Sequence, residues 1–326
     1  MPTSPTMQSR PLRFPIPAPP IPSKTQLVSP RGAKLATRVW PSIKKVPSAL
    51  CLLVHGGGWH SGYFETLATS LTKHNIFVAA YDQPGDGYSE PEPDAPSPTV
   101  KHVRSFDWFV EDVFEALEWM KQEADVTKSD NIPVYLFGES FGGLVVLGAA
   151  LEKGLYKSRI DGLVISGGVI HIKDEFLPPK PIVTLLLLLS KYYPKLTMPS
   201  TDFESTFDEA FGDKEWARTS RQDPKIVMRI QPTLGSVAAT LGTGQLVMAR
   251  AQELAIPILA IHGKNDCRAD CSNMQQFVDK LGPETAKLKI VDTNGHQLLQ
   301  DQPEVTKEII DTISDWIVTQ ARALNG

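Results

Sequence analysis

From Ala49 onward, short apolar runs alternate with longer segments of helical periodicity. The runs are typical of strands that are buried on both faces, and they are Leu50–Val54, Ile76–Tyr81, Val134–Phe137, Leu163–Ile165, Ile256–Ile261 and Leu288–Val291. Between them, apolar residues recur at spacings of three and four, for example over Phe106–Leu117 and Ile309–Ile317, which predicts amphipathic helices. Strands that alternate with helices predict an α/β protein with a mostly parallel, doubly wound sheet.

The alternation is interrupted once, in residues 169–253. There, prolines, aromatic residues and a leucine run occur without strand-like spacing. A chain of 326 residues with 41% hydrophobic content can bury one large core that carries an insertion. We therefore expect a helical cap at 169–253, inserted between a first part of the core at 24–168 and a second part at 254–326.

The N-terminal region differs in composition from the rest. Residues 1–23 are rich in proline, which predicts a flexible, partly polyproline-like tail. No Asp or Glu precedes Glu65, as in organellar transit peptides, but the prolines would prevent the amphipathic helix that many of these form. We expect a cytoplasmic protein and leave organellar targeting by the tail open. Next, Leu27–Val28 and Leu35–Val39 predict a hairpin around residues 29–32.

Charge and hydropathy limit the partners of the chain. A net charge of −4 and a pI near 6.0 provide no basic field that would attract a phosphate backbone, so we expect no nucleic-acid partner. No apolar stretch approaches the ~20 residues that span a bilayer. The longest, Pro181–Leu189, is flanked by Lys180 and Lys191, which is compatible with peripheral contact at most.

The cysteine content indicates neither a disulfide framework nor a metal centre. Three cysteines, Cys51, Cys267 and Cys271, are an odd and small number that is typical of a reduced intracellular protein. Cys267 and Cys271 are close enough in sequence to pair or to bind a metal. Because no second cysteine pair accompanies them, we interpret them as free thiols.

The segment Gly138–Gly142 has the Gly-X-Ser-X-Gly pattern of a nucleophile elbow. The glycines are needed because the serine lies on a sharp strand-to-helix turn, where flanking side chains would collide. The pattern alone arises by chance in about one chain in ten of this length. Here Val134–Phe137 predicts a buried strand before it and Gly143–Leu151 a helix after it. We therefore predict that Ser140 is a nucleophile.

A serine hydroxyl needs a general base, and the base needs a carboxylate that orients it. In proteins with this elbow the order along the chain is serine, acid, histidine, with the last two on loops after later strands. Asp266 follows the run that ends at Ile261, and His296 follows the run that ends at Val291. The sequence thus predicts a Ser140-Asp266-His296 triad. The alternatives match these loop positions less well: Asp292 and Asp270 as the acid, and His262 as the base.

Such a triad also requires backbone N–H donors for the oxyanion of the tetrahedral intermediate. The glycine run at 56–58 directly follows an early strand and offers unencumbered backbone. We predict an oxyanion hole formed by the amides of Gly57 and Phe141. This chemistry requires no metal and no organic cofactor.

Together, these residues resemble the monoglyceride lipase family of α/β-hydrolase fold serine hydrolases. The similarity extends from about Ser29 to Trp316. His55–Gly62 is similar to the oxyanion segment of that family, Asp82–Ser89 to the loop that follows, and Gly138–Gly143 to its elbow. The resemblance implies the α/β-hydrolase fold with a cap. Its acid and base fall on Asp266 and His296, and its oxyanion amides on Gly57 and Phe141.

The chain departs from the family pattern at three places. Trp59 stands where the family usually has Glu, Gly85-Asp86-Gly87 stands where Gly-His-Gly is usual, and Phe141 replaces a common Met. None of these changes affects the triad, but they affect the surroundings of the substrate. The substrate is therefore less constrained by the resemblance than the mechanism is.

The residues and the resemblance lead us to expect a serine esterase that cleaves carboxylic esters of lipids, with monoacylglycerol as the leading substrate. A lysophospholipase or a small-molecule carboxylesterase would use the same triad, and a ligand-binding protein without turnover is the alternative from another class. The cap of the family faces lipid, which suits Ile182–Leu189 with Tyr192 and Tyr193 and implies peripheral membrane contact. A cap helix packed on the core would give the same sequence pattern.

Overall fold

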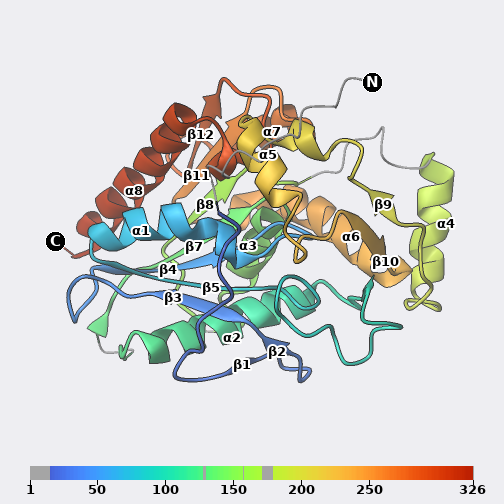
Figure 1. The fold of residues 1–326 in the computed structure, drawn as a ribbon, viewed down its shortest axis with the longest axis horizontal. Helices are drawn as coiled ribbons and strands as arrows, with labels where there is room; N and C mark the ends of the chain where they lie inside the picture. The colour runs from blue at the N-terminus through green and yellow to red at the C-terminus, as the bar shows by residue number, and fades with distance from the viewer. Residues whose placement is uncertain (1–14, 128–129, 157, 171–178, 326) are drawn as a thin grey trace, which may run out of the picture.

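The computed structural model describes residues 15–127, 130–156, 158–170 and 179–325. Its centre is a sheet with the strand order β12-β11-β8-β7-β4-β5-β3 (Figure 1). The strands are β3 Thr37–Trp40, β4 Ala49–Val54, β5 Ile76–Tyr81, β7 Val134–Glu139, β8 Gly162–Ser166, β11 Ile258–Gly263 and β12 Ala286–Val291. All neighbours are parallel except β3, which pairs with β5 in the antiparallel direction. The predicted doubly wound, mostly parallel sheet is confirmed.

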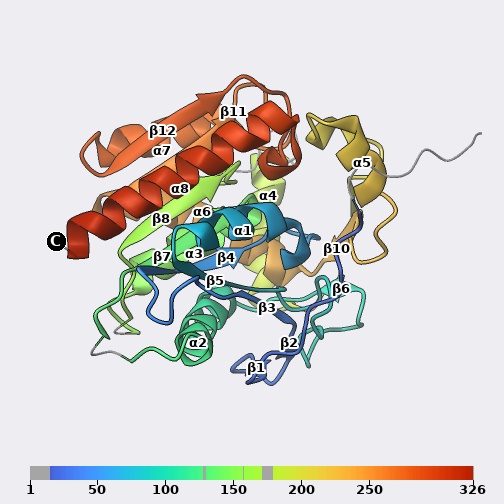
Figure 2. The ribbon, with the colours of Figure 1, turned by 60° about the vertical axis from the view of Figure 1, so that its left-hand side comes forward.

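Helices cover both faces of this sheet (Figure 2). One face is covered by α1 Glu65–Lys73 and α8 Pro303–Asn325. The other is covered by α2 Asp107–Glu123, α3 Phe141–Glu152 and α7 Cys271–Leu281. Short 3₁₀ turns that the structure describes in the connections are η1 Ser61–Phe64, η4 Phe207–Ala210, η5 Ala251–Glu253 and η6 Leu298–Gln300.

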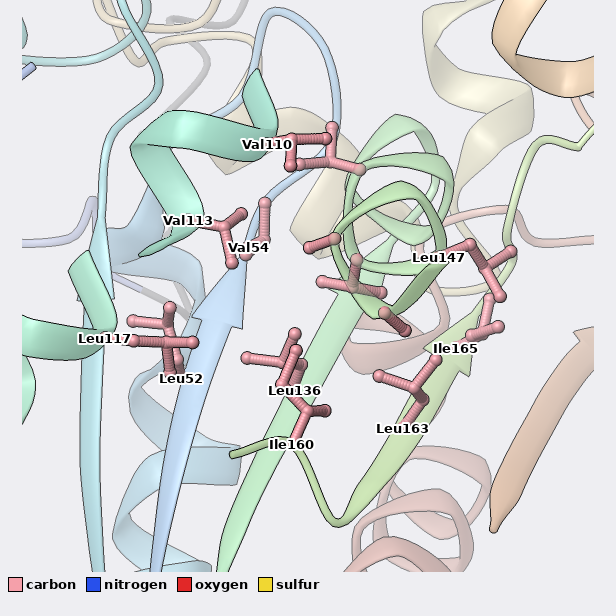
Figure 3. Close-up of a cluster of buried hydrophobic side chains, with 14 of the residues drawn as sticks. Leu52, Val54, Val110, Val113, Leu117, Leu136, Leu147, Ile160, Leu163 and Ile165 are labelled. Atoms are coloured by element: carbon pink, nitrogen blue, oxygen red, sulfur yellow. The ribbon is translucent and has the colours of Figure 1, made fainter. Parts of the chain in front are cut away.

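The double covering explains why the strands are apolar at successive positions. In β4, Leu52 and Val54 face the α2 and α3 side, whereas Leu53 faces the α1 and α8 side. Figure 3 shows the hydrophobic cluster on the α2 and α3 side, in which strand residues such as Leu136 and Leu163 approach the residues of α2 and α3. Each such side chain contributes about 1.5–3 kcal/mol when it is removed from water.

The predicted hairpin is only partly correct. β1 Leu27–Val28 pairs with β2 Lys34–Leu35, but the predicted strand at 35–39 is divided, because the chain leaves this ladder and continues as β3 at the edge of the main sheet. At the break, the Ala36 N–H donates to Ser89 Oγ over 2.9 Å, and the Ala36 carbonyl accepts from the Asp82 N–H over 2.8 Å. The loop after β5 therefore takes over the hydrogen bonds at this position.

The described part of the segment between β8 and β11 forms further helices and short strands outside the main sheet. Its elements are α4 Lys180–Ser190, β9 Thr201–Asp202, α5 Lys214–Ser220, β10 Arg229–Pro232 and α6 Leu234–Arg250. β10 pairs with β9 and also, in parallel, with β6 Val100–Lys101 from the first half of the chain. Parts of the predicted tail (1–14) and cap (171–178) lie outside the described residues. In the described ranges, no helix has both the length and the apolar character that crossing a bilayer requires.

Candidate active site

Ser140 occupies the turn between β7 and α3, in a backbone conformation that is unusual for a residue with a side chain. Its φ of 53° and ψ of −119° lie in a sparsely populated region that costs about 1–3 kcal/mol. A Cβ at Gly138 would meet the backbone of Gly142, and a Cβ at Gly142 would meet the carbonyl of Val54. The two flanking glycines are therefore required by close backbone approach, as the elbow pattern predicts.

The structure brings Ser140, His296 and Asp266 together from three separate loops. His296 Nε2 lies 2.8 Å from Ser140 Oγ. On the other side of the ring, His296 Nδ1 lies 2.8 Å and 3.0 Å from the two carboxylate oxygens of Asp266. Ser140 is partly exposed, whereas His296 and Asp266 are buried. This is the geometry in which an imidazole can take a proton from a hydroxyl while a carboxylate holds its tautomer.

The Asp266 carboxylate is stabilised in its charged form. Burial by itself would raise its pKa, but the charge and the hydrogen bond of His296 outweigh burial and lower that pKa below its ordinary value. The N–H groups of Arg268 and Ala269 also donate to Asp266 Oδ1, over 2.8 Å and 3.0 Å. Asp266 therefore remains an anion that can orient the imidazole at neutral pH.

The alternative residues occupy other positions. Asp270 is the N-cap of α7 and accepts from the Ser272 N–H over 2.8 Å. Asp292 is exposed. His262 is fully buried, and its Nε2 lies 3.5 Å from Asp266 Oδ2, on a strand that ends beside the acid. None of these side chains has a contact with Ser140 of the kind that His296 makes.

The glycine run after β4 lies against the elbow. Gly57 is exposed, and a Cβ added to it would be 4.0 Å from Phe141 Cβ. Phe141 is the first residue of α3, so its N–H is one of the helix donors that lack an intrahelical acceptor. Gly57 thus lies next to the first residue of α3, which directly follows Ser140.

A buried histidine, His55, fixes the start of this glycine run. The Gln83 N–H donates to His55 Nε2 over 2.8 Å, so the ring proton lies on Nδ1 and donates to the Gly56 carbonyl over 2.7 Å. Burial lowers the pKa of His55, which keeps the ring neutral and this tautomer stable. Gln83 Nε2 also donates to the His55 carbonyl over 2.6 Å. The sequence analysis missed Gln83, whose only signal was its position just after a predicted strand.

Trp59 lies in a buried aromatic cluster beside the site. Its ring centroid is 4.5 Å from that of Tyr63 and 6.0 Å from that of Phe211. The side chain of Cys267, next to Asp266 in the chain, packs against this cluster. Aromatic packing therefore occupies the position where the resembled family usually has an acidic side chain.

Glu139, the residue before Ser140, has a fully buried carboxyl group. Neither of its oxygens makes a hydrogen bond within the described part of the chain. Burial raises the pKa of this carboxyl to about 8, because no donor stabilises the charged form. At neutral pH the group is therefore protonated, which keeps a negative charge away from the neighbouring Ser140.

Replacing Glu139 with glutamine should flatten the pH dependence of stability. Unfolded glutamate has a pKa of about 4.3, so between that pH and about 8 the folded protein holds a proton that the unfolded chain has lost. Raising the pH across this window removes stability from the wild type, by up to about 1.4 kcal/mol per pH unit more than from the variant. Urea unfolding at pH 5, 6, 7 and 8 measures the difference, and parallel curves would contradict it.

The three cysteines are free thiols. Cys51 is buried, and burial raises the pKa of its thiol well above the ordinary value, so it is unreactive. In the ranges that the structure describes, no group of three or more His, Cys, Asp or Glu side chains is arranged to hold a metal ion.

Comparison with known families gives a match over most of the chain. Residues 45–303 match the family described as serine aminopeptidase, S33. Monoacylglycerol lipase from Mycolicibacterium smegmatis is 26% identical over 288 residues, which cover 88% of this chain and 94% of the relative. Human monoglyceride lipase is 26% identical over 301 residues, which cover 92% of this chain and 91% of the relative.

Solved structures agree in fold. A soluble variant of monoglyceride lipase from Saccharomyces cerevisiae, in complex with a substrate analogue, has a TM-score of 0.74 at 20% identity and covers 96% of this chain and 97% of its own. A thermostable carboxyl esterase from Bacillus coagulans, in complex with glycerol, has a TM-score of 0.73 at 18% identity and covers 91% and 98%. The α/β-hydrolase fold predicted from the sequence is confirmed.

Proposed function

The chain belongs to the family described as serine aminopeptidase, S33, and from this premise we propose that it cleaves carboxylic esters of lipids, with monoacylglycerols as its preferred substrates. The observation that carries the proposal is the continuous contact from Asp266 through His296 to Ser140. Relatives named monoacylglycerol lipase, which align over most of both chains, support the choice of substrate.

The mechanism follows from the hydrogen bonds of the site. Ser140 Oγ attacks the ester carbonyl while His296 Nε2 takes the hydroxyl proton, and the amides of Gly57 and Phe141 stabilise the oxyanion. The imidazolium then gives its proton to the leaving alcohol, and an acyl-serine ester remains. A water molecule, activated by the same imidazole, hydrolyses that ester and restores Ser140. Asp266 keeps the imidazole in one tautomer throughout and stabilises its positive charge.

A substrate panel tests the proposed specificity. We expect kcat/KM for a long-chain monoacylglycerol to exceed, by at least about tenfold, that for a lysophosphatidylcholine of the same acyl chain and for a short p-nitrophenyl ester. A tenfold difference corresponds to about 1.4 kcal/mol of transition-state stabilisation, which one pocket contact can supply. Preference for the phosphate headgroup or for the short ester would replace this substrate by one of the two alternatives.

The family description makes an amino-acid amide the necessary further member of the panel. Amide cleavage would use the same Ser140 chemistry, but the site would have to recognise the free α-amino group on the acyl side of the amide bond. Aminoacyl p-nitroanilide turnover above that of the monoacylglycerol would contradict the lipid-ester proposal.

We also propose that α4 contacts a lipid surface. Leu185 and Leu188 are each about half exposed, and Tyr192 is 74% exposed. Exposed apolar side chains that are grouped in this way often mark a contact surface. Residues 179–200 contain three lysines and no acidic residue, in a chain whose net charge is −4. In Figure 1, α4 lies at the periphery of the molecule beside α6, where such a face is accessible. An apolar face with flanking cations suits the interface of an anionic bilayer.

Vesicle sedimentation tests the membrane contact. Binding should be stronger to phosphatidylcholine vesicles in which about a third of the lipid is phosphatidylglycerol than to pure phosphatidylcholine vesicles. The Leu185→Gln/Leu188→Gln variant should lose at least about 90% of this binding, because two leucines buried in the bilayer contribute about 3 kcal/mol or more. Ile43→Gln/Leu155→Gln is the matched control, since both residues are exposed elsewhere. Equal binding of the two variants would contradict the proposal.

A further inference from the structure

Asp301 is a buried acidic residue that the proposed mechanism does not use. It follows η6, downstream of the loop that carries His296, and its side chain is only 2% exposed. Thr293 Oγ1 donates to its Oδ2 over 2.5 Å, and the Gln302 N–H donates to its Oδ1 over 2.7 Å. A carboxylate is retained in such a site only when donors replace its lost hydration, so these two bonds are required.

The Thr293 hydroxyl extends this contact to the base. Its Oγ1 accepts from the Gly295 N–H over 3.0 Å, and Gly295 directly precedes His296. The Thr293 carbonyl accepts from the Asn265 N–H over 3.2 Å, and Asn265 directly precedes Asp266. Thr293 thus connects the loop of the base to the loop of the acid, and Asp301 holds Thr293.

A second set of contacts docks the 210–212 segment on the base loop. The N–H groups of His296 and Gln297 both donate to the Ala210 carbonyl over 2.8 Å. Gln302 Nε2 donates to the Gly212 carbonyl over 2.8 Å, and a Cβ at Gly212 would collide with the Asp301 carboxylate. The Asp301 carboxylate therefore lies between the 210–212 segment and the loop that carries His296.

We propose that Asp301 is a positioning residue for His296, which acts through the Thr293 hydroxyl. Hydrogen bonds to a carboxylate are about twice as strong as those between neutral groups. The bond from Thr293 to Asp301 therefore holds the hydroxyl that accepts from the Gly295 N–H, directly before the base. The inference rests on the proposed function, because only a catalytic imidazole needs such fixing. Displacement of a catalytic group by about 1 Å costs about 10²-fold in rate.

The test uses the threonine, because two variants of it separate the loss of the hydroxyl from a change in side-chain shape. Thr293→Val removes the hydroxyl at nearly constant shape, and Thr293→Ser keeps it. We expect Thr293→Val to lower kcat by about 10-fold to 100-fold with KM changed less than about threefold, and to slow fluorophosphonate labelling of Ser140 by a similar factor. Thr293→Ser should restore both rates to within about threefold of the wild type. Asp301→Asn should show the same loss in kcat and labelling.

Thr306→Val is the matched control. Thr306 Oγ1 accepts from the Asp301 N–H over 3.2 Å and donates to the Asp301 carbonyl over 3.1 Å, so it contacts the backbone of Asp301 and not its carboxylate. This variant should lower Tm and leave kcat and the labelling rate unchanged below the transition. If Thr293→Val labels at the wild-type rate, or if Thr306→Val loses rate to the same extent, the positioning role is overturned.

The labelling readout separates this inference from the substrate assignment. Wild-type protein that labels at Ser140 but hydrolyses no lipid ester would reject the proposed substrate, and the comparison of Thr293→Val with Thr293→Ser would still decide the role of Asp301. Wild-type protein that does not label at Ser140 would overturn both.

Discussion

Replacing Ser140 with alanine is expected to abolish ester hydrolysis, lowering kcat/KM by about 10⁴-fold to 10⁶-fold. The hydroxyl is 2.8 Å from His296 Nε2, and no other nucleophile is in that position. The variant should keep its fold, because alanine is nearly the same size as serine and the strained φ of 53° is the same in both proteins. Initial rates on a monoacylglycerol, with circular dichroism for the fold, provide the measurement.

Ser272→Ala serves as the control for this variant. Ser272 is exposed at the start of α7, and its loss should leave turnover within about twofold of the wild type, as for most surface substitutions. Ser140→Ala protein that retains a tenth or more of wild-type turnover would refute the assignment of the nucleophile. Loss of fluorophosphonate labelling in the same variant shows directly which serine reacts.

Replacing Asp266 with asparagine should lower kcat by about 10⁴-fold. An asparagine amide can turn its N–H toward His296 Nδ1, which stabilises the tautomer with the proton on Nε2, and an imidazole in that state cannot accept the Ser140 proton. The loss of the anion also removes the charge that stabilises the imidazolium. A kcat that falls with little change in KM is the expected signature.

The other two candidate acids provide matched controls for this substitution. Asp270→Asn should be nearly silent, because asparagine caps a helix as well as aspartate does and Asp270 is the N-cap of α7. Asp292→Asn should also be nearly silent, since Asp292 is exposed. If Asp292→Asn lost activity while Asp266→Asn kept it, the acid would be Asp292.

Local sequence was sufficient for the sheet and for the candidate triad. Strands with both faces covered must be apolar at successive positions, so runs such as the one at 76–81 indicated where the sheet lies. The carboxyl ends of parallel strands meet at one edge, and Ser140, Asp266 and His296 each follow such an end. Their contact could therefore be predicted from order and position, although their catalytic role remains a proposal.

Elements that depend on distant partners could not be predicted in this way. β6 and β10 are short strands that exist because residues far apart in the sequence pair with each other, and neither has an apolar pattern. The break at Ala36 results from bonds to the loop after β5. α7 was missed although Met274, Phe277, Val278 and Leu281 recur at helical spacing, and its N-cap Asp270 was considered as a catalytic acid instead.

The sequence by itself determined which residues can react, since hydrophobic period and glycine spacing depend only on local backbone geometry. Only the tertiary structure decided how those residues are held and charged. The raised pKa of Glu139 is set by the surroundings of its side chain, and the buried contact between Asp301 and Thr293 requires a segment from elsewhere in the chain to cover it. Desolvation and hydrogen bonding depend on what surrounds a group in space, and that environment is formed by residues that lie far from it in the sequence.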